Sequence, residues 1–168
     1  IHQANLFPTG YSGLEDRGVG DGAGANTNLP LPSGCGHDAY LYAIERVVLP
    51  LIQSFRPDII IIANGLDASH VDPLGRMSCL SSTYAQMTSM IMAAADEHCG
   101  GRVVAIHEGG YSEAYVPFCG HRVVESLAGI QSDLVDPFLP KFLEQQPDAA
   151  QVAQQCAAID TMAARLGL

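Results

Sequence analysis

Two short runs of β-branched and aliphatic residues constrain what this 168-residue chain can fold into. The first run occupies residues 58–63 (DIIIIA) and the second occupies residues 102–106 (RVVAI). Apolar runs of this length are typical of strands buried on both faces of a parallel sheet. Ligands of such sheets bind just beyond the carboxyl ends of the strands. We therefore expect a functional site that includes Asp67, shortly after the first run, and Tyr111, shortly after the second.

The chain before the first run predicts a loop, a short strand and a long helix. Glycine and polar residues at 5–24 indicate a loop, and residues 25–31 indicate a short strand. Apolar residues recur at helical spacing over residues 38–55, which predicts one helix. Pro50 is expected either to kink this helix or to mark its last turn.

Helices are also expected after each of the two apolar runs. The first covers about residues 83–97, with Ser81 or Ser82 as its N-cap and with Gly100-Gly101 at its end. The second follows Tyr111 and extends to about residue 127. Alternating strands and helices predict an α/β fold, in which helices flank a parallel sheet and the crossovers are right-handed.

The last 39 residues carry weaker signals. Residues 130–146 indicate an extended connection with one helical turn, and residues 148–166 predict a helix with an apolar stripe. We expect this helix to pack on its own domain, with packing on a second subunit as the alternative. The second arrangement would make the protein a homo-oligomer. The predicted organisation is one unit over residues 1–129 and a carboxyl-terminal extension over residues 130–168.

Three glycine-containing motifs occur in order along the chain. They are Gly18–Gly24 with the segments at 28–32 and 34–36 that follow it, the block GLDA with DPLG within residues 65–75, and EGGY at residues 108–111. Together they resemble the signatures of the zinc-dependent deacetylases of the histone deacetylase and acetylpolyamine amidohydrolase superfamily, especially class II-like bacterial members. The resemblance covers about residues 5–129 and matches the carboxyl-terminal part of the family's catalytic domain. It implies an arginase/deacetylase-like fold.

The resemblance gives individual residues roles in the hydrolysis of an acetyl amide. Asp67 matches the aspartate that binds Zn²⁺. Tyr111 matches the tyrosine whose hydroxyl stabilises the oxyanion when metal-bound water attacks the carbonyl. Gly109 and Gly110 let the backbone approach the substrate, and Leu74 matches a residue that lines the acyl-lysine channel. The implied substrates are acetylated lysine peptides or acetylpolyamines.

Asp72 has a structural role in this reading. It precedes Pro73, and a side chain in that position commonly orders a turn by accepting hydrogen bonds from backbone N–H groups. We expect Asp72 to order the motif loop in this way rather than to take part in the chemistry.

The chain departs from the family in what it lacks. The family takes its other two zinc ligands from an Asp-x-His segment and its general base from a His-His pair. This sequence has no His-His pair, and its one Asp-x-His, at residues 96–98, follows Asp67 instead of preceding it as in the family. Its six histidines match none of the family's positions. One carboxylate cannot hold a catalytic zinc. We therefore expect a fragment that is inactive alone. Two alternatives stay open: a non-catalytic relative that binds acetylated ligands, and another metallohydrolase of the arginase-like fold.

Composition narrows the partners. The formal net charge is -10, and Lys141 is the only lysine. This charge argues against nucleic-acid binding. Acidity that serves only solubility is the preferred interpretation, and attraction of cationic ligands is the alternative. Five cysteines without a Cys-x-x-Cys pair indicate reduced thiols and a cytoplasmic location. No apolar segment is long enough to span a membrane, so no membrane association is expected.

Overall fold

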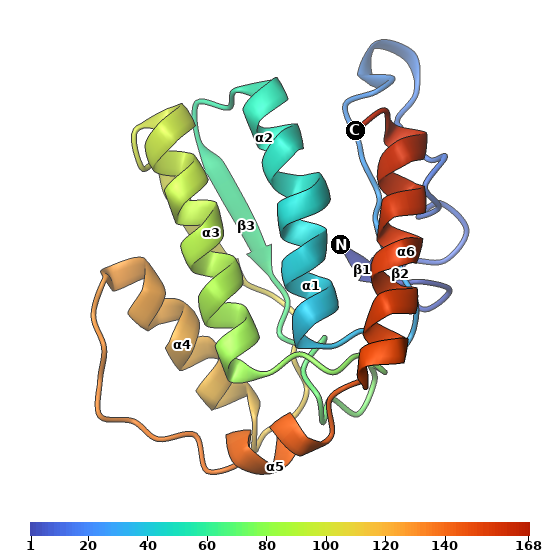
Figure 1. The fold of residues 1–168 in the computed structure, drawn as a ribbon. Coiled ribbons are helices and arrows are strands. Elements are labelled where there is room, and N and C mark those ends of the chain that lie inside the picture. The colour runs from blue at the N-terminus through green and yellow to red at the C-terminus, as the bar shows by residue number, and fades with distance from the viewer.

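The computed structural model describes all residues from 1 to 168, and its helices lie around two small pairs of parallel strands (Figure 1). The strands are β1 (His2–Gln3), β2 (Pro30–Leu31), β3 (Ile60–Asn64) and β4 (Val103–His107). The helices are α1 (His37–Ala43), α2 (Leu49–Phe55), α3 (Ser81–Cys99), α4 (Val116–Ala128), α5 (Leu139–Glu144) and α6 (Ala149–Leu166). A 3₁₀ turn at Gly20–Gly22 interrupts the first loop.

The strands pair in parallel, as the alternation of elements predicts. In the larger pair, Ile60 lies opposite Val103 and Asn64 lies opposite His107, with α3 as the connection between the strands. In the smaller pair, His2 lies opposite Pro30. The expected strand at 25–31 shortens to two residues, and it pairs with β1 instead of joining β3 in one sheet.

The helix expected over residues 38–55 extends unbroken from His37 to Phe55 but contains a wider turn. Between α1 and α2, residues 44–48 form a π-helical segment in which the Leu49 N–H donates to the Ile44 carbonyl. Pro50 follows directly. It has no N–H and its ring clashes with the carbonyl four residues earlier in a regular α-helix, so a widened turn accommodates it. Pro50 therefore neither ends the helix nor marks its last turn.

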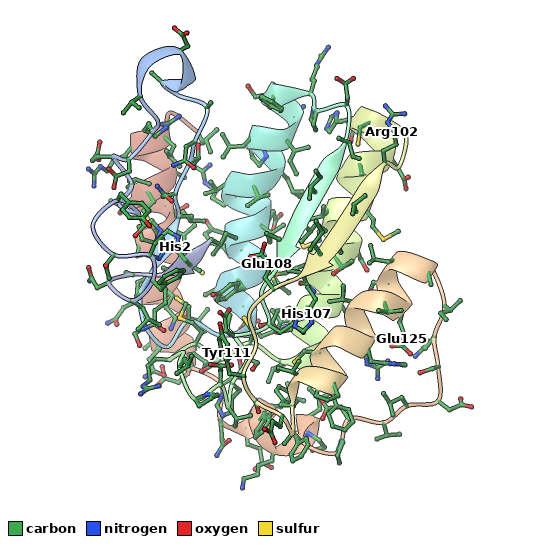
Figure 2. All side chains as sticks on the ribbon, turned by 180° about the vertical axis from the view of Figure 1, so that it is seen from behind. His2, Arg102, His107, Glu108, Tyr111 and Glu125 are labelled. Carbon is green, nitrogen blue, oxygen red and sulfur yellow. The ribbon has the colours of Figure 1, made fainter.

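The expectation that β3 and β4 are buried on both faces is wrong. In Figure 1, α2 and α3 lie in front of β3, whereas in Figure 2 no helix crosses β4 on the side turned to the viewer. Side chains on the uncovered face are accordingly open to solvent: Ile61 is 62% exposed and Ile106 is 51% exposed. The helices of this chain cover only one face of the pair.

A core of 18 buried residues connects the helices. Tyr115 belongs to this core, and its ring makes edge contacts with Phe138 and Phe142. The helix α6 packs against α1, and its Ile159 and Ala163 are fully buried. None of the helices combines the length and the hydropathy that a membrane-spanning helix needs.

The helix α3 begins at Ser81, about two residues before its expected start. Its N-cap is Leu80, not Ser81 or Ser82, and the Leu80 N–H donates to the Thr83 hydroxyl at 2.9 Å. Ser81 is engaged elsewhere, because its hydroxyl donates to Asp136 Oδ2 at 2.6 Å. The helix ends at Cys99 with Gly100 in the left-handed conformation, as its glycines predict.

Candidate active site

The loops that follow β3 and β4 lie side by side at the carboxyl edge of the pair. The strands end in register, and two backbone hydrogen bonds continue the contact: the Glu108 N–H donates to the Asn64 carbonyl at 3.2 Å, and the Leu66 N–H donates to the Gly109 carbonyl at 2.7 Å. Figure 2 shows Glu108 and Tyr111 along the loop that leaves β4. The two motifs, 41 residues apart at Asp67 and Glu108, are thereby joined.

Glycines surround the side chain of Asp67. A Cβ atom at Gly65 would lie 3.1 Å from Asp67 Oδ1, and one at Gly109 would lie 3.0 Å from Asp67 Cγ. At Gly75, a Cβ atom would lie 3.5 Å from the Asp67 carbonyl carbon. Any side chain at Gly109 would displace the carboxylate. These glycines leave a close-fitting space for one carboxylate at the strand ends.

Gly110 is required for a different reason. Its φ of +131° lies in a region that residues with a side chain rarely adopt, and a Cβ atom there would lie 2.9 Å from Leu66 Cβ and 3.0 Å from Val116 Cγ2. Leu66 is buried, with an exposed fraction of 1%. The second glycine thus lets the β4 loop pass close over Leu66 before the chain reaches Tyr111.

Asp72 connects the two loops through its side chain. Its Oδ1 accepts hydrogen bonds from the N–H groups of Leu74 at 2.8 Å and Gly75 at 3.1 Å, which closes the turn expected at Asp72-Pro73. Its Oδ2 accepts a third hydrogen bond, at 2.8 Å, from the Tyr111 N–H. Asp72 is 7% exposed, so water competes little for these bonds.

The electrostatic environment of Asp67 is negative. Burial raises the pKa of its carboxyl above the ordinary value, its own backbone N–H acts in the opposite direction, and the charges of Asp72 and Glu108 raise the pKa further. None of these influences comes from a basic side chain. A cation bound at Asp67 would therefore relieve both desolvation and like-charge repulsion.

Tyr111 and Leu74 are the accessible members of the site. Their side chains are 53% and 58% exposed, respectively, in contrast to the buried Asp72 to which both backbones are bonded. The structure thus brings Asp67, Gly109, Gly110, Tyr111 and the backbone of Leu74 together on two adjoining loops. Both side chains remain free to meet a ligand.

Asp67 is the candidate metal ligand of the two-loop site. No three His, Cys, Asp or Glu side chains lie together where they could hold an ion. The glycine-lined space and the negative surroundings suit Asp67 to bind a cation through oxygen, but a catalytic zinc takes three protein ligands. The residues present therefore fit one position of a zinc site and do not complete it.

The histidines beside the motifs have other surroundings. His70 Nε2 lies 3.0 Å from Gln145 Oε1, and its ring packs on Phe142 with 4.7 Å between centroids. His107 is exposed at the end of β4, where it lines the cavity between the strands and α4 that is described next. Neither residue faces Asp67 as part of a ligand set.

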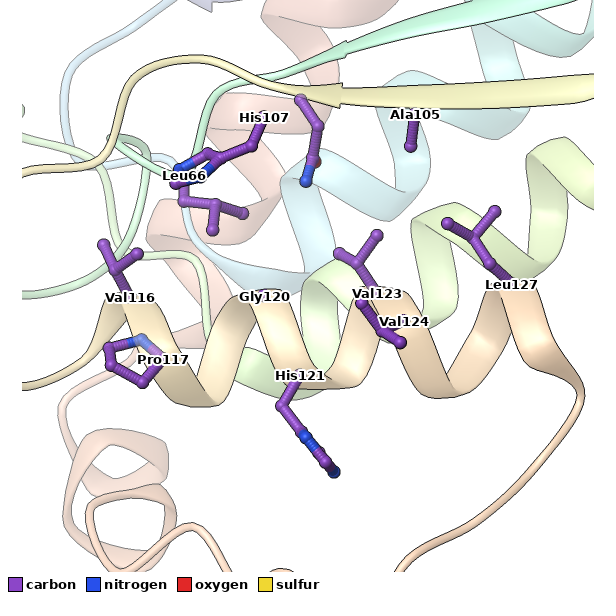
Figure 3. Close-up of a pocket in the computed structure, with 11 residues that line it drawn as sticks. Leu66, Ala105, His107, Val116, Pro117, Gly120, His121, Val123, Val124 and Leu127 are labelled. Atoms are coloured by element: carbon purple, nitrogen blue, oxygen red, sulfur yellow. The ribbon is translucent and has the colours of Figure 1, made fainter.

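A cavity of about 340 Å³ lies between α4 and the strands (Figure 3). Leu66, Ala105 and His107 line it from the strand side, and Val116, Gly120 and Val123 line it from α4. Asp67, Leu74 and Tyr111 do not contribute to its wall. This apolar cavity is therefore separate from the two-loop site.

Sequence reasoning missed the hydrogen bond between Asp72 and Tyr111. The Asp-Pro pair indicates bonds to the residues just after it, and these are present. The third bond joins residues 39 positions apart, and no local pattern in the chain reveals it. The sequence feature that bears on this bond is the pair of parallel strands, because strands that end at one edge bring the loops after them within reach of each other.

The model of the histone deacetylase domain matches residues 1–127. This chain belongs to the histone deacetylase domain family. A histone deacetylase-like amidohydrolase of Pseudomonas aeruginosa is 52% identical over 169 residues, which cover 100% of this chain and 44% of that protein. A probable deacetylase of Archaeoglobus fulgidus is 35% identical over 156 residues, covering 90% of this chain and 43% of that protein.

Solved structures of the histone deacetylase family show the same fold. The structure of the histone deacetylase Clr3 superposes with a TM-score of 0.74 at 29% identity, over 96% of this chain and 25% of that chain. The HDA15 HD domain superposes with a TM-score of 0.71 at 26% identity, over 96% of this chain and 41% of that chain. The chain thus has a deacetylase-like α/β fold and spans less than half the length of these relatives.

Proposed function

We propose that this chain is the part of a zinc-dependent deacetylase that supplies one metal ligand, Asp67, and the oxyanion donor, Tyr111. The observation that carries the proposal is the junction of the two motif loops. Asp67 occupies a glycine-lined space there, and the Tyr111 N–H donates a hydrogen bond to Asp72 on the loop that carries Asp67. Membership of the histone deacetylase family supports hydrolysis of an acetyl amide as the reaction. The remaining ligands and the general base would come from sequence beyond these residues.

Each side chain has a defined task in this proposal. Zinc supplies Lewis-acid polarisation of the amide carbonyl and activation of water. Asp67 contributes an anionic oxygen whose charge is otherwise uncompensated, because its neighbours Asp72 and Glu108 are also acidic. Tyr111 presents a half-exposed phenol that can donate a hydrogen bond to the carbonyl oxygen as negative charge develops there.

The substrate we propose is an acetylated lysine peptide or an acetylpolyamine. The net charge of -10 favours the approach of cationic molecules, and acetylpolyamines and acetylated peptides that contain further basic residues are cationic. The side chain of Leu74 is exposed, and its backbone is bonded to Asp72, which also bonds the Tyr111 backbone. Leu74 can therefore contact the aliphatic part of such a substrate, and the backbone of Gly109 and Gly110 lies on the adjoining loop. Five cysteines that form no disulfide support a cytoplasmic location.

The test is Asp67→Ala in the full-length natural protein. We expect loss of bound zinc, measured by elemental analysis, together with loss of hydrolysis of an acetyl-lysine peptide and of an acetylpolyamine. Asp58→Ala is the matched control, because Asp58 is an exposed aspartate at the opposite end of the same strand run. Retention of zinc and activity by Asp67→Ala would overturn the proposal. A wild-type protein that binds the acetylated peptide without hydrolysing it would favour a non-catalytic relative.

A further inference from the structure

We propose that Asp72 is a positioning residue of this site, which holds the oxyanion donor in place by bonding the Tyr111 backbone to the loop that carries Asp67 and Leu74. The inference rests on the proposed function and assigns a role to a residue that neither binds the metal nor touches the substrate. Its basis is the distribution of three hydrogen bonds over the two oxygens of one buried carboxylate.

The two oxygens of Asp72 have separate tasks. Oδ1 accepts from Leu74 and Gly75 and so fixes the turn within its own loop. Oδ2 accepts only from the Tyr111 N–H, at 2.8 Å, across to the other loop. Hydrogen bonds to a carboxylate are stronger than those between neutral groups. Asp72 is 7% exposed, so water competes little for this one.

Tyr111 depends on this bond more than a core tyrosine would. Its side chain is 53% exposed, so packing restrains it little. The two preceding residues are glycines, and Gly110 has a backbone conformation that other residues rarely adopt. The bond to Asp72 is therefore a principal restraint on where the Tyr111 backbone, and with it the phenol, lies relative to Asp67.

Asp72→Asn separates the two tasks. The side-chain amide of asparagine has one acceptor oxygen. We expect this oxygen to face the N–H groups of Leu74 and Gly75, because there it satisfies two donors. The NH₂ group then faces the Tyr111 N–H and cannot accept a hydrogen bond from it. The turn persists while the link between the loops is lost. We expect kcat of the full-length protein to fall about tenfold to a hundredfold, the range for a small displacement of a catalytic group, with KM nearly unchanged.

A buried aspartate elsewhere gives a matched control. Asp136 also precedes a proline, and it is 5% exposed. Its Oδ1 accepts from the Phe138 N–H and its Oδ2 accepts from the Ser81 hydroxyl. Asp136→Asn therefore makes the same chemical change in the same kind of turn, away from the site. We expect it to alter thermal stability but to leave kcat unchanged.

Two measurements separate positioning from general stability. Asp72→Asn should accelerate amide hydrogen exchange in the peptide that contains Tyr111, and Asp136→Asn should not. The second measurement combines Asp72→Asn with Tyr111→Phe, which keeps the backbone N–H but removes the phenol hydroxyl. If Asp72 acts through that hydroxyl, Asp72→Asn costs less than about twofold in kcat in the Tyr111→Phe background.

Each outcome bears on one proposal. Unchanged exchange at Tyr111 in Asp72→Asn, or a full loss of kcat that persists in the Tyr111→Phe background, would overturn the positioning role. A wild-type protein without deacetylation, or a Tyr111→Phe variant as active as wild type, would overturn the proposed function instead. The exchange measurement decides the link between the loops in either case.

Discussion

The carboxylate of Asp67 occupies the space that a side chain at Gly109 would need. A Cβ atom at Gly109 would lie 3.0 Å from Asp67 Cγ and closer still to Oδ2. The loop that follows β4 therefore limits the positions of the carboxylate that follows β3. Gly109 thus limits where the carboxylate that we propose as a metal ligand can lie.

Gly109→Ala should weaken zinc binding without removing a ligand. The added methyl group must displace the Asp67 carboxylate, and changes that disturb the orientation of a ligand typically cost about 10- to 100-fold in metal affinity. Zinc retained during competition with a graded chelator, in the full-length protein, measures this loss. Gly22→Ala is the control, because nothing lies within 4 Å of a Cβ atom there. Wild-type zinc affinity in Gly109→Ala would contradict the expectation.

Tyr111→Phe should lower kcat and leave KM nearly unchanged. Removal of one oxyanion donor typically costs about 10²- to 10³-fold in kcat, because the donor acts mainly on the charge that develops in the transition state. Steady-state hydrolysis of an acetyl-lysine peptide measures the effect. Tyr11→Phe makes the same change at an exposed tyrosine in the first loop, 69% exposed, and should have no effect. Equal kcat values for wild type and Tyr111→Phe would remove Tyr111 from the mechanism.

Tyr115→Phe should have the opposite consequence from Tyr111→Phe. Tyr115 is fully buried, and its hydroxyl accepts a hydrogen bond from the Ser81 N–H at 2.9 Å. Loss of the hydroxyl leaves a buried donor without a partner, which costs about 1–3 kcal/mol in the free energy of unfolding. Urea denaturation of the two variants provides the comparison. A Tyr115→Phe protein as stable as wild type, or a Tyr111→Phe protein equally destabilised, would contradict this contrast.

Local patterns predicted those elements that local forces determine. The β-branched residues of 59–62 and 103–106 predict β3 and β4, and because parallel strands end at one edge, the same patterns place Asp67 and Tyr111 on neighbouring loops. The resemblance to the deacetylase family, which the comparison confirms, assigns chemistry to those two residues. Their catalytic roles remain predictions.

Where the structure departs from the sequence-based predictions, contacts between residues far apart in the chain are the cause. Ser81 is not the N-cap of α3 because its hydroxyl donates to Asp136, 55 residues later. An uninterrupted apolar run indicates burial but not which neighbours supply it, and within this chain one face of β3 and β4 has none. The bond from Tyr111 to Asp72 likewise depends on how two loops meet, which sequence spacing alone does not determine.

Glu125 closes the segment between α4 and α5. Its Oε1 accepts a hydrogen bond from the Ser132 N–H at 2.6 Å, and its Oε2 accepts one from Arg122 Nη1 at 2.5 Å. The hydrogen bonds from Ser132, together with the interaction with Arg122, lower the pKa of Glu125 from its ordinary value of 4.5 to about 2. The ionised form is therefore favoured in the folded chain.

Glu125→Gln should reduce stability most at neutral pH. A carboxyl with a lowered pKa stabilises the fold fully above its unfolded value, and this contribution disappears as the pH falls from 4.5 toward 2. The difference in urea midpoint between wild type and Glu125→Gln should thus be largest at pH 7 and should narrow below about pH 4.5. Glu45→Gln, at an exposed position of the π-helical segment, is the control, because it leaves the hydrogen bonds of Glu125 in place. If this difference in urea midpoint instead widened as the pH fell, the ionised form of Glu125 would not be what stabilises the segment, because protonation of Glu125 in the wild type should make the two proteins more alike.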